Sequence, residues 1–150
     1  MTPKQKTAGW LAIAIAVVGA YEGLSLTAYP DIVGVPTICY GETKNVKLGQ
    51  TATKEQCDSQ LSARLVEFNQ GVESCVTRPM RDNERVAFVS LSYNIGVDAF
   101  CKSTVVRRFN AGDKAGACDA ILMWNRAGGK VVQGLVNRRQ KEREMCLKDY

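Results

Sequence analysis

An uncharged, apolar run near the amino terminus constrains the fold of this chain more than any other feature. Residues 7–21, TAGWLAIAIAVVGAY, follow Lys4 and Lys6 and end directly before Glu22. As an α-helix this run would be roughly 22 Å long at about 1.5 Å per residue, shorter than the ~30 Å hydrocarbon core of a bilayer. A basic start before a moderately apolar stretch is typical of an export signal, although no convincing polar cleavage region follows. The run predicts an export segment or a buried first helix, and one helix could serve both roles at different times.

The length and composition indicate a single globular domain. The chain has 150 residues, of which 45% are hydrophobic and 23% are charged, so it can bury a core and is too apolar to be disordered. We find no repeat, low-complexity segment or long linker. Lys and Arg number 20 against 15 Asp and Glu, and the net charge of +5 favours anionic partners such as nucleic acid, acidic lipid or a charged polymer.

The sequence contains no histidine, which excludes serine–histidine and cysteine–histidine nucleophiles. Proton transfer would therefore have to use carboxylates. The six cysteines are widely spaced, without a CxxC pair, so disulfides in an oxidising compartment are a better interpretation than metal ligands. Buried thiols in a cytosolic protein are the alternative. The cysteines are Cys39, Cys57, Cys75, Cys101, Cys118 and Cys146.

The remaining pattern is mainly helical. Residues 31–40, DIVGVPTICY, combine β-branched side chains with Gly34 and Pro36, which predicts a short, irregular hairpin. Thr53 and Gln56 form a capping-box pattern at the start of a helix that Pro79 ends. Further helices are predicted over residues 82–96, 103–110 and 113–126, and from about residue 135 onward. The pattern indicates an α+β fold, in which a small hairpin is attached to a helical body.

Two carboxylates border the predicted hairpin. Glu22 follows the apolar run, so partial desolvation would favour its protonated form and suit a general acid. Asp31 lies beyond a turn, where it can stay ionised. Two carboxyl groups facing each other across a cleft can break a glycosidic bond, because one protonates the leaving oxygen and the other directs water or attacks the sugar. On spacing alone, solvated surface charges are the better interpretation, because two acids nine residues apart occur in most soluble proteins.

The stretch YEGLSLTAYPDIVGVPTICYG, with Glu22, Asp31 and Thr37, resembles the catalytic signature of the phage-type lysozymes, the endolysin muramidases. The segments SLSYNIGVDAFCKSTVVRRFNAGD and GACDAILMWNRAGGKVVQGLVNRRQKEREMC resemble the central and carboxy-terminal parts of that family. With its apolar amino terminus, the chain resembles endolysins that carry a signal-arrest-release segment. The resemblance implies such a segment over residues 1–21, continuing into the first helix, and a mainly helical lysozyme-like catalytic domain over residues 22–150.

The resemblance also implies catalytic roles. Glu22 would protonate the departing sugar oxygen, Asp31 would orient and activate water, and Thr37 would help hold that water on the opposite face of the ring. Inversion at the anomeric carbon is expected.

Three further residues match the family's substrate-binding positions: Tyr93, Asn94 and Arg138. Without the resemblance, Tyr93 would be interpreted as a core aromatic residue and Arg138 as a solvated helix charge. An arginine near Glu22 stabilises its ionised form, so desolvation must dominate or the contact must loosen when substrate binds. Trp124 fits either stacking on sugar rings or packing in the core.

For the cysteines, chain order and the family-like segments suggest the pairs Cys75–Cys101 and Cys118–Cys146, which leaves Cys39–Cys57. This pairing is one hypothesis among the fifteen connectivities that six cysteines allow. The pair Cys39–Cys57 would brace the segment that carries Thr37.

We therefore expect an endolysin that hydrolyses the β-1,4 bond between N-acetylmuramic acid and N-acetylglucosamine in peptidoglycan and causes host lysis. It would act as a monomer and need neither cofactor nor metal. Transient association with the host inner membrane through residues 7–21 would precede release into the periplasm; the alternative is a cytoplasmic enzyme that needs a separate holin. A non-catalytic, lysozyme-like wall-binding protein is the other functional hypothesis. No zinc-finger, RRM or homeodomain signature is present, so no nucleic-acid partner is expected.

Overall fold

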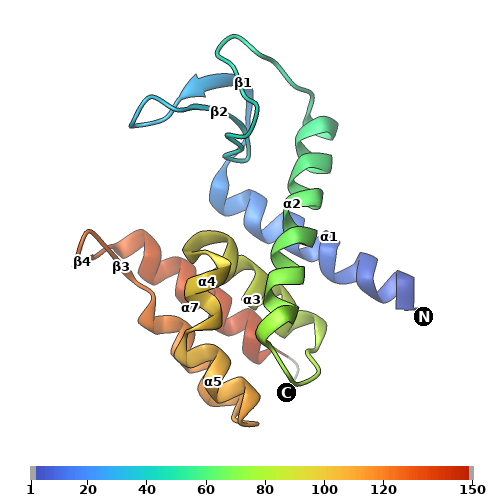
Figure 1. Cartoon of the computed structure of the whole chain (residues 1–150), viewed down its shortest axis with the longest axis vertical. Helices are drawn as coiled ribbons and strands as arrows, with labels where there is room; N and C mark the ends of the chain where they lie inside the picture. Colours follow the sequence, from blue (N-terminus) through green and yellow to red (C-terminus); the bar gives the residue numbers. More distant parts are fainter. Residues whose placement is uncertain (1–2, 149–150) are drawn as a thin grey trace.

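The computed structural model describes residues 3–148 and confirms the α+β class (Figure 1). A small antiparallel hairpin lies at one end of a mainly helical body. The elements that carry the site are α1 (Pro3–Glu22), β1 (Ser25–Pro30), β2 (Pro36–Cys39), α2 (Lys54–Cys75), α3 (Asp82–Ile95) and α7 (Gln133–Leu147).

Helix α1 contains the apolar run and packs against α2 and α3. Its buried face carries Trp10, Ala14 and Val18 at the helical i, i+4, i+8 spacing. The helix ends at Glu22 because Gly23 takes a positive φ of 73°. The start of α1 projects beyond the helical body (Figure 1). Of the helices within the described residues, none is long and apolar enough to cross a membrane.

The hairpin begins earlier than the sequence pattern predicted. Strand β1 pairs with β2 so that Tyr29 lies opposite Thr37. Residues 31–35, the first half of the predicted hairpin, form the turn between the two strands. The Asp31 carboxylate accepts hydrogen bonds from the backbone N–H groups of Val33 and Val35, and Gly34 has a φ of 84°. Such local side-chain bonding favours a turn over a strand.

The predicted ends of several helices are confirmed. Thr53 and Gln56 form both hydrogen bonds of a capping box at the start of α2. Gly96 ends α3, and the Ser103 side chain caps α5 (Thr104–Asn110). The short helix α4 (Val97–Cys101) was not predicted.

The predicted helix over residues 113–126 is wrong in its second half. Helix α6 (Lys114–Ala120) passes into a 3₁₀ turn, η1 (Ile121–Met123), and a second hairpin follows, formed by β3 (Arg126–Ala127) and β4 (Lys130–Val131). Gly128 and Gly129 link these strands with φ of 59° and 78°. Two consecutive positive φ values suit a tight two-residue hairpin loop and end helical propagation.

Helix α3 forms the centre of the core and contacts α1, α2 and α7. Its residues 86–92 are all buried. Phe88 packs against Phe100 and Phe109, with ring centroids 5.6 and 5.2 Å apart. Buried aromatic pairs of this kind stabilise a core beyond their buried area.

Three disulfides join distant parts of the chain, in the pairs suggested above. Cys39–Cys57 links β2 to α2, Cys75–Cys101 links α2 to α4, and Cys118–Cys146 links α6 to α7. The first of these bonds ties the hairpin to the helical body.

Candidate active site

Glu22 lies where α1, α7 and the end of β2 meet. Arg138, on α7, donates a hydrogen bond from Nη1 to Glu22 Oε1 at 2.9 Å. The Glu22 side chain is 24% exposed and that of Arg138 is 9% exposed, so the ion pair is shielded while the carboxylate still reaches solvent. On the other side is Gly41, where a Cβ atom would lie 3.8 Å from Glu22 Oε2. The absence of a side chain at Gly41 leaves space next to that oxygen.

Arg138 is itself held by several groups. Its Nη2 donates to the backbone carbonyl of Ser90 at 3.3 Å, and its Nε donates to Glu142 Oε2 at 3.4 Å. The guanidinium carbon lies 4.6 Å from the ring centroid of Tyr21, within cation–π distance. Arg138 therefore links the carboxylate of Glu22 to the buried face of α7.

Behind Arg138 lies a buried ionic cluster. Arg139 and Glu142 are 0% and 1% exposed, and their Nε and Oε1 atoms lie 2.6 Å apart. The Ser90 hydroxyl donates to Glu142 Oε2. Burial raises the pKa of Glu142 although two arginines oppose this, and burial lowers the pKa of Arg139.

Glu142 and Ser90 were not predicted as parts of the site. The spacing of Arg138, Arg139 and Glu142 on one helix, at i, i+1 and i+4, was the available signal. Similar spacing is common on solvated helices, so only the fold shows that this face of α7 is buried.

Asp31 and Thr37 lie on the hairpin. The two N–H groups that bond to Asp31 Oδ1, at 2.9 and 2.8 Å, fix the orientation of its carboxylate. The Thr37 hydroxyl donates to the Val35 carbonyl at 2.9 Å, and Thr37 is only 5% exposed. Within residues 3–148, no hydrogen bond joins Glu22 to either side chain. The link is the backbone of β2, which carries Thr37 and leads to Gly41 beside Glu22.

Tyr93 connects the end of α3 to the end of β2. Its hydroxyl donates to the Tyr40 carbonyl at 3.4 Å, and its ring centroid lies 5.0 Å from that of Phe68. Burial, together with the negative charges of Glu22 and Glu42, raises the pKa of Tyr93 to about 12. Tyr93 therefore stays protonated at neutral pH and can act as a hydrogen-bond donor.

The next residue, Asn94, is exposed, and its side-chain oxygen accepts from Arg139 Nη2 at 2.9 Å. Through this bond the buried cluster reaches the surface at the end of α3.

The segment after β2 is anchored to α2 by a second ion pair. Arg64 Nη2 and Nε donate to the two carboxylate oxygens of Glu42 at 2.6 and 3.0 Å. These bonds lower the pKa of Glu42. Such a two-point contact fixes geometry as well as charge.

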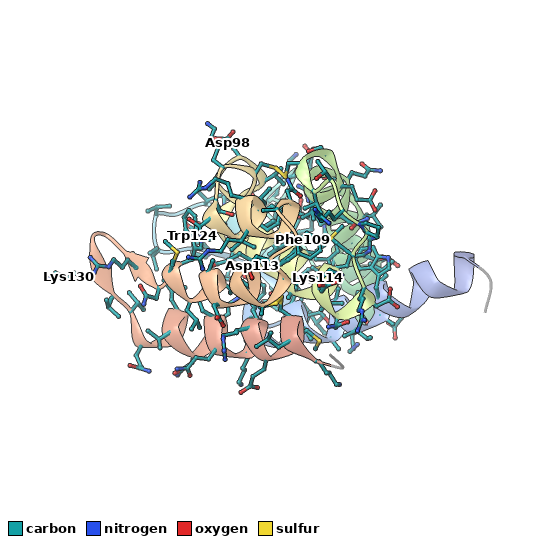
Figure 2. All side chains as sticks on the ribbon, turned by 90° about the horizontal axis from the view of Figure 1, so that it is seen from below. Asp98, Phe109, Asp113, Lys114, Trp124 and Lys130 are labelled. Carbon is teal, nitrogen blue, oxygen red and sulfur yellow. A yellow bond between two sulfur atoms is a disulfide. The ribbon has the colours of Figure 1, made fainter. Side chains whose placement is uncertain are left out.

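Trp124 lies apart from these groups. It lines a pocket of ≈ 340 Å³ with Lys102, Ser103, Thr104, Arg107 and Met123. Figure 2 shows Trp124 between the helices and the β3–β4 hairpin, whose second strand begins at Lys130. Among the residues that the structure describes, no group of three or more acidic or cysteine side chains is arranged to hold a metal ion.

Comparison with known proteins shows the family to which the chain belongs. The phage lysozyme family model matches residues 19–142. The chain is 42% identical to the "SAR-endolysin" of Enterobacteria phage P21 over 84% of this chain and 77% of that protein. It is 43% identical to the "SAR-endolysin" of Pseudomonas phage phiKMV, over 91% and 88% of the two chains.

Solved structures show the same fold. The endolysin of Escherichia coli O157:H7 phage FAHEc1 superposes with a TM-score of 0.83 at 38% identity, covering 91% of this chain and 92% of that one. A mutant of P22 lysozyme superposes with a TM-score of 0.85 at 35% identity, covering 91% and 96%. The family match includes Glu22, the hairpin and Arg138, and the chain belongs to the phage lysozyme family.

Proposed function

We propose how this peptidoglycan-hydrolysing lysozyme of the endolysin type cleaves the β-1,4 bond between N-acetylmuramic acid and N-acetylglucosamine. Glu22 acts as the general acid that protonates the leaving oxygen. Asp31 directs the attacking water, and Thr37 helps hold it on the other face of the sugar ring. The observation that carries this proposal is the half-buried Glu22 carboxylate, held by Arg138 and left open beside Gly41.

The contact with Arg138 has to change during the reaction. A guanidinium stabilises a carboxylate over the neutral acid, whereas Glu22 must carry a proton to the leaving oxygen. We infer that bound substrate loosens the bond from Arg138 Nη1, while the bonds from Arg138 to Ser90 and Glu142 keep the arginine in place. Arg138 is then a positioning residue. Tyr93 and Asn94, at the end of α3, contact the sugar chain in this proposal.

The decisive test is Glu22→Gln, which keeps the size of the side chain and removes the transferable proton. Hydrolysis of purified peptidoglycan should fall by at least the ~100-fold typical of lost general acid catalysis. Asp31→Asn should be similarly damaging and Thr37→Ala less so. Near-normal activity of a folded Glu22→Gln protein would overturn the assignment.

The stereochemistry gives a second test. A water molecule between the two carboxyl groups implies inversion, which needs a separation of ~6.5–9.5 Å. The first product seen by NMR should have the α configuration, and a β product before mutarotation would contradict the role of Asp31.

We propose further that residues 7–21 hold the protein in the host inner membrane before the enzyme acts as a monomer in the periplasm. The names of the relatives from phages P21 and phiKMV support a signal-arrest-release segment. Lys4 and Lys6 would stay on the cytoplasmic side, following the positive-inside tendency. A short run built largely from Ala and Gly with a few Ile and Val would leave lipid at a modest cost. In the folded enzyme this run is part of α1, so its release would bring Glu22 next to Arg138.

Fractionation tests this order of events. Full-length protein should be in the membrane fraction early and in the periplasm after an uncoupler is added, uncleaved in both. Protein found only in the cytosol would reject the membrane step and leave the muramidase roles untouched.

A further inference from the structure

A groove between α1 and α7 borders the site described above and meets it at Tyr21. Its volume is ≈ 460 Å³. Three α1 residues and Met145 give it an apolar floor, and three charged side chains, two on α7 and one directly after its end, line the groove as well. The lining residues are Val17, Ala20, Tyr21, Lys141, Glu144, Met145 and Lys148.

An exposed apolar stripe of α1 continues this floor. Ile13 is 43% exposed, and Ala16 and Ala20 are exposed as well. Ile13, Val17 and Ala20 follow the i, i+4, i+7 spacing, which places them on one face of the helix. Val17 packs partly against the core, whereas Ile13 and Ala20 are exposed, and the core face of Trp10, Ala14 and Val18 lies roughly a quarter turn around the helix. Figure 2 shows the start of α1 extending beyond the other helices.

The charges beside the groove favour an anionic partner. Lys141 and Lys148 are exposed and form no ion pair within residues 3–148. Lys141 lies on α7 and Lys148 directly follows its last residue, and both side chains line the groove. Glu144 lies between them and is also exposed, which leaves a net positive rim on a protein whose net charge is +5.

We propose that this face docks the folded enzyme onto a bilayer that contains anionic phospholipid. The stripe of Ile13, Val17 and Ala20 enters the interface between headgroups and acyl chains, and Lys141 and Lys148 pair with lipid phosphates. An apolar helix face flanked by lysines is the arrangement by which surface helices bind acidic membranes, because long lysine stems cover apolar surface while their ammonium groups reach the phosphates. Docking depends only on the folded state of α1. It does not depend on the catalytic roles proposed for Glu22, Asp31 and Thr37, or on insertion of residues 7–21 into the membrane.

Vesicle flotation with the full-length, folded protein tests the proposal. Wild type should float with phosphatidylcholine vesicles that contain phosphatidylglycerol and not with pure phosphatidylcholine. Reversing both lysines, in Lys141→Glu with Lys148→Glu, should weaken binding at least about tenfold, given the contribution of each basic residue at an acidic surface. The matched control is Lys44→Glu with Lys47→Glu, which makes the same charge change at two exposed residues after β2 and should retain most of the binding.

A second pair of variants tests the apolar stripe. Ile13→Ser should reduce flotation several-fold, as expected when an inserted side chain is lost. Val66→Ser removes a similarly exposed apolar side chain, 37% exposed on α2, and should change nothing.

Two results would overturn the proposal. Equal loss of binding in the two double-lysine variants would mean that only the net charge matters. A dimer of the wild type in lipid-free solution that Ile13→Ser converts to monomer would identify a second copy of the chain as the occupant of the stripe. Hydrolysis of purified, lipid-free peptidoglycan should be unchanged in Lys141→Glu with Lys148→Glu. If the Glu22→Gln protein keeps its hydrolytic activity and still floats with the vesicles, the proposed catalytic role of Glu22 is wrong and the docking proposal is unaffected.

Discussion

The two carboxylates of the candidate site lie in regions with very different packing. Glu22 borders the helical body, where residues 86–92 of α3 are all buried and Arg138 connects to the buried ionic cluster. Asp31 lies at the turn of a two-stranded hairpin next to Ile32, which is 103% exposed. The Cys39–Cys57 disulfide ties the hairpin to α2, and Tyr40 and Glu42, directly after β2, bond to Asp58 and Arg64 on the same helix.

This difference shows how a small domain can place two groups on opposite sides of a substrate. The body fixes the proton donor through dense packing, which tolerates little movement. The hairpin fixes its own turn locally, through the Asp31 hydrogen bonds, and is tied to the body at Cys39 and Glu42. Substitutions in the body should therefore mainly reduce stability, whereas loss of the hairpin's ties should affect catalysis as well.

The largest effect on stability should come from the buried cluster. Glu142→Gln leaves the Arg139 charge without a counter-ion in a fully buried position, so the free energy of unfolding should fall by about 3–5 kcal/mol. Urea unfolding measures this change. Glu144→Gln, on the exposed side of the same helix, is the control and should have little effect. Equal stability of the two variants would show that the body is not the rigid region.

A smaller loss should follow from removing the hairpin's disulfide. Cys39 and Cys57 are 18 residues apart in sequence, and opening a loop of this size costs about 3 kcal/mol in the chain-entropy account. Cys39→Ala with Cys57→Ala should also lower kcat, because β2 carries Thr37 and leads to Glu22. Cys118→Ala with Cys146→Ala removes a bond within the body and should reduce stability without a comparable loss of kcat. If kcat falls equally in both variants, the hairpin's disulfide has no special role in catalysis, and the proposed difference between hairpin and body is wrong.

The Glu42–Arg64 pair gives a pH-dependent test of the tie between hairpin and body. Because Arg64 lowers the pKa of Glu42 in the folded state, the stabilisation is fully present above the ordinary value of 4.5 and is lost as pH falls through the lowered folded value. Glu42→Gln should cost about 2 kcal/mol at neutral pH, as for a hydrogen-bonded charged group. The difference from wild type should shrink in acid, as thermal unfolding at several pH values can show. A difference that does not depend on pH would mean that the ion pair is not its source.

The smallest effect is expected at the hairpin tip. Ile32→Ser replaces a side chain that makes no buried contact, so stability should change by no more than ~0.5 kcal/mol. Val86→Ser, in the buried run of α3, is the contrasting variant and should be strongly destabilising. Thermal melts of both proteins measure the two losses of stability. Equal losses would contradict the proposed difference between the exposed hairpin tip and the buried body.

The sequence by itself determined the features that depend on neighbouring residues. The capping box of Thr53 and Gln56, the stop at Gly96 and the Ser103 cap each involve groups within one helical turn, so they could be predicted from sequence spacing. Prediction from neighbouring residues failed where the same segment could form either a helix or a hairpin. The helical pattern of residues 113–126 gave way to a 3₁₀ turn and a hairpin, because Gly128 and Gly129 allow a tight turn.

Only the tertiary structure decided the surroundings of Glu22. The residues that hold it come from α3 and α7, far along the chain, and their identities give no sign of burial. Arg139 and Glu142 look like an ordinary solvated helix face in the sequence, yet both are buried because α7 packs against α3. A charge on a helix is exposed or buried according to what packs on it, and that depends on contacts between distant segments, which helical spacing alone does not reveal.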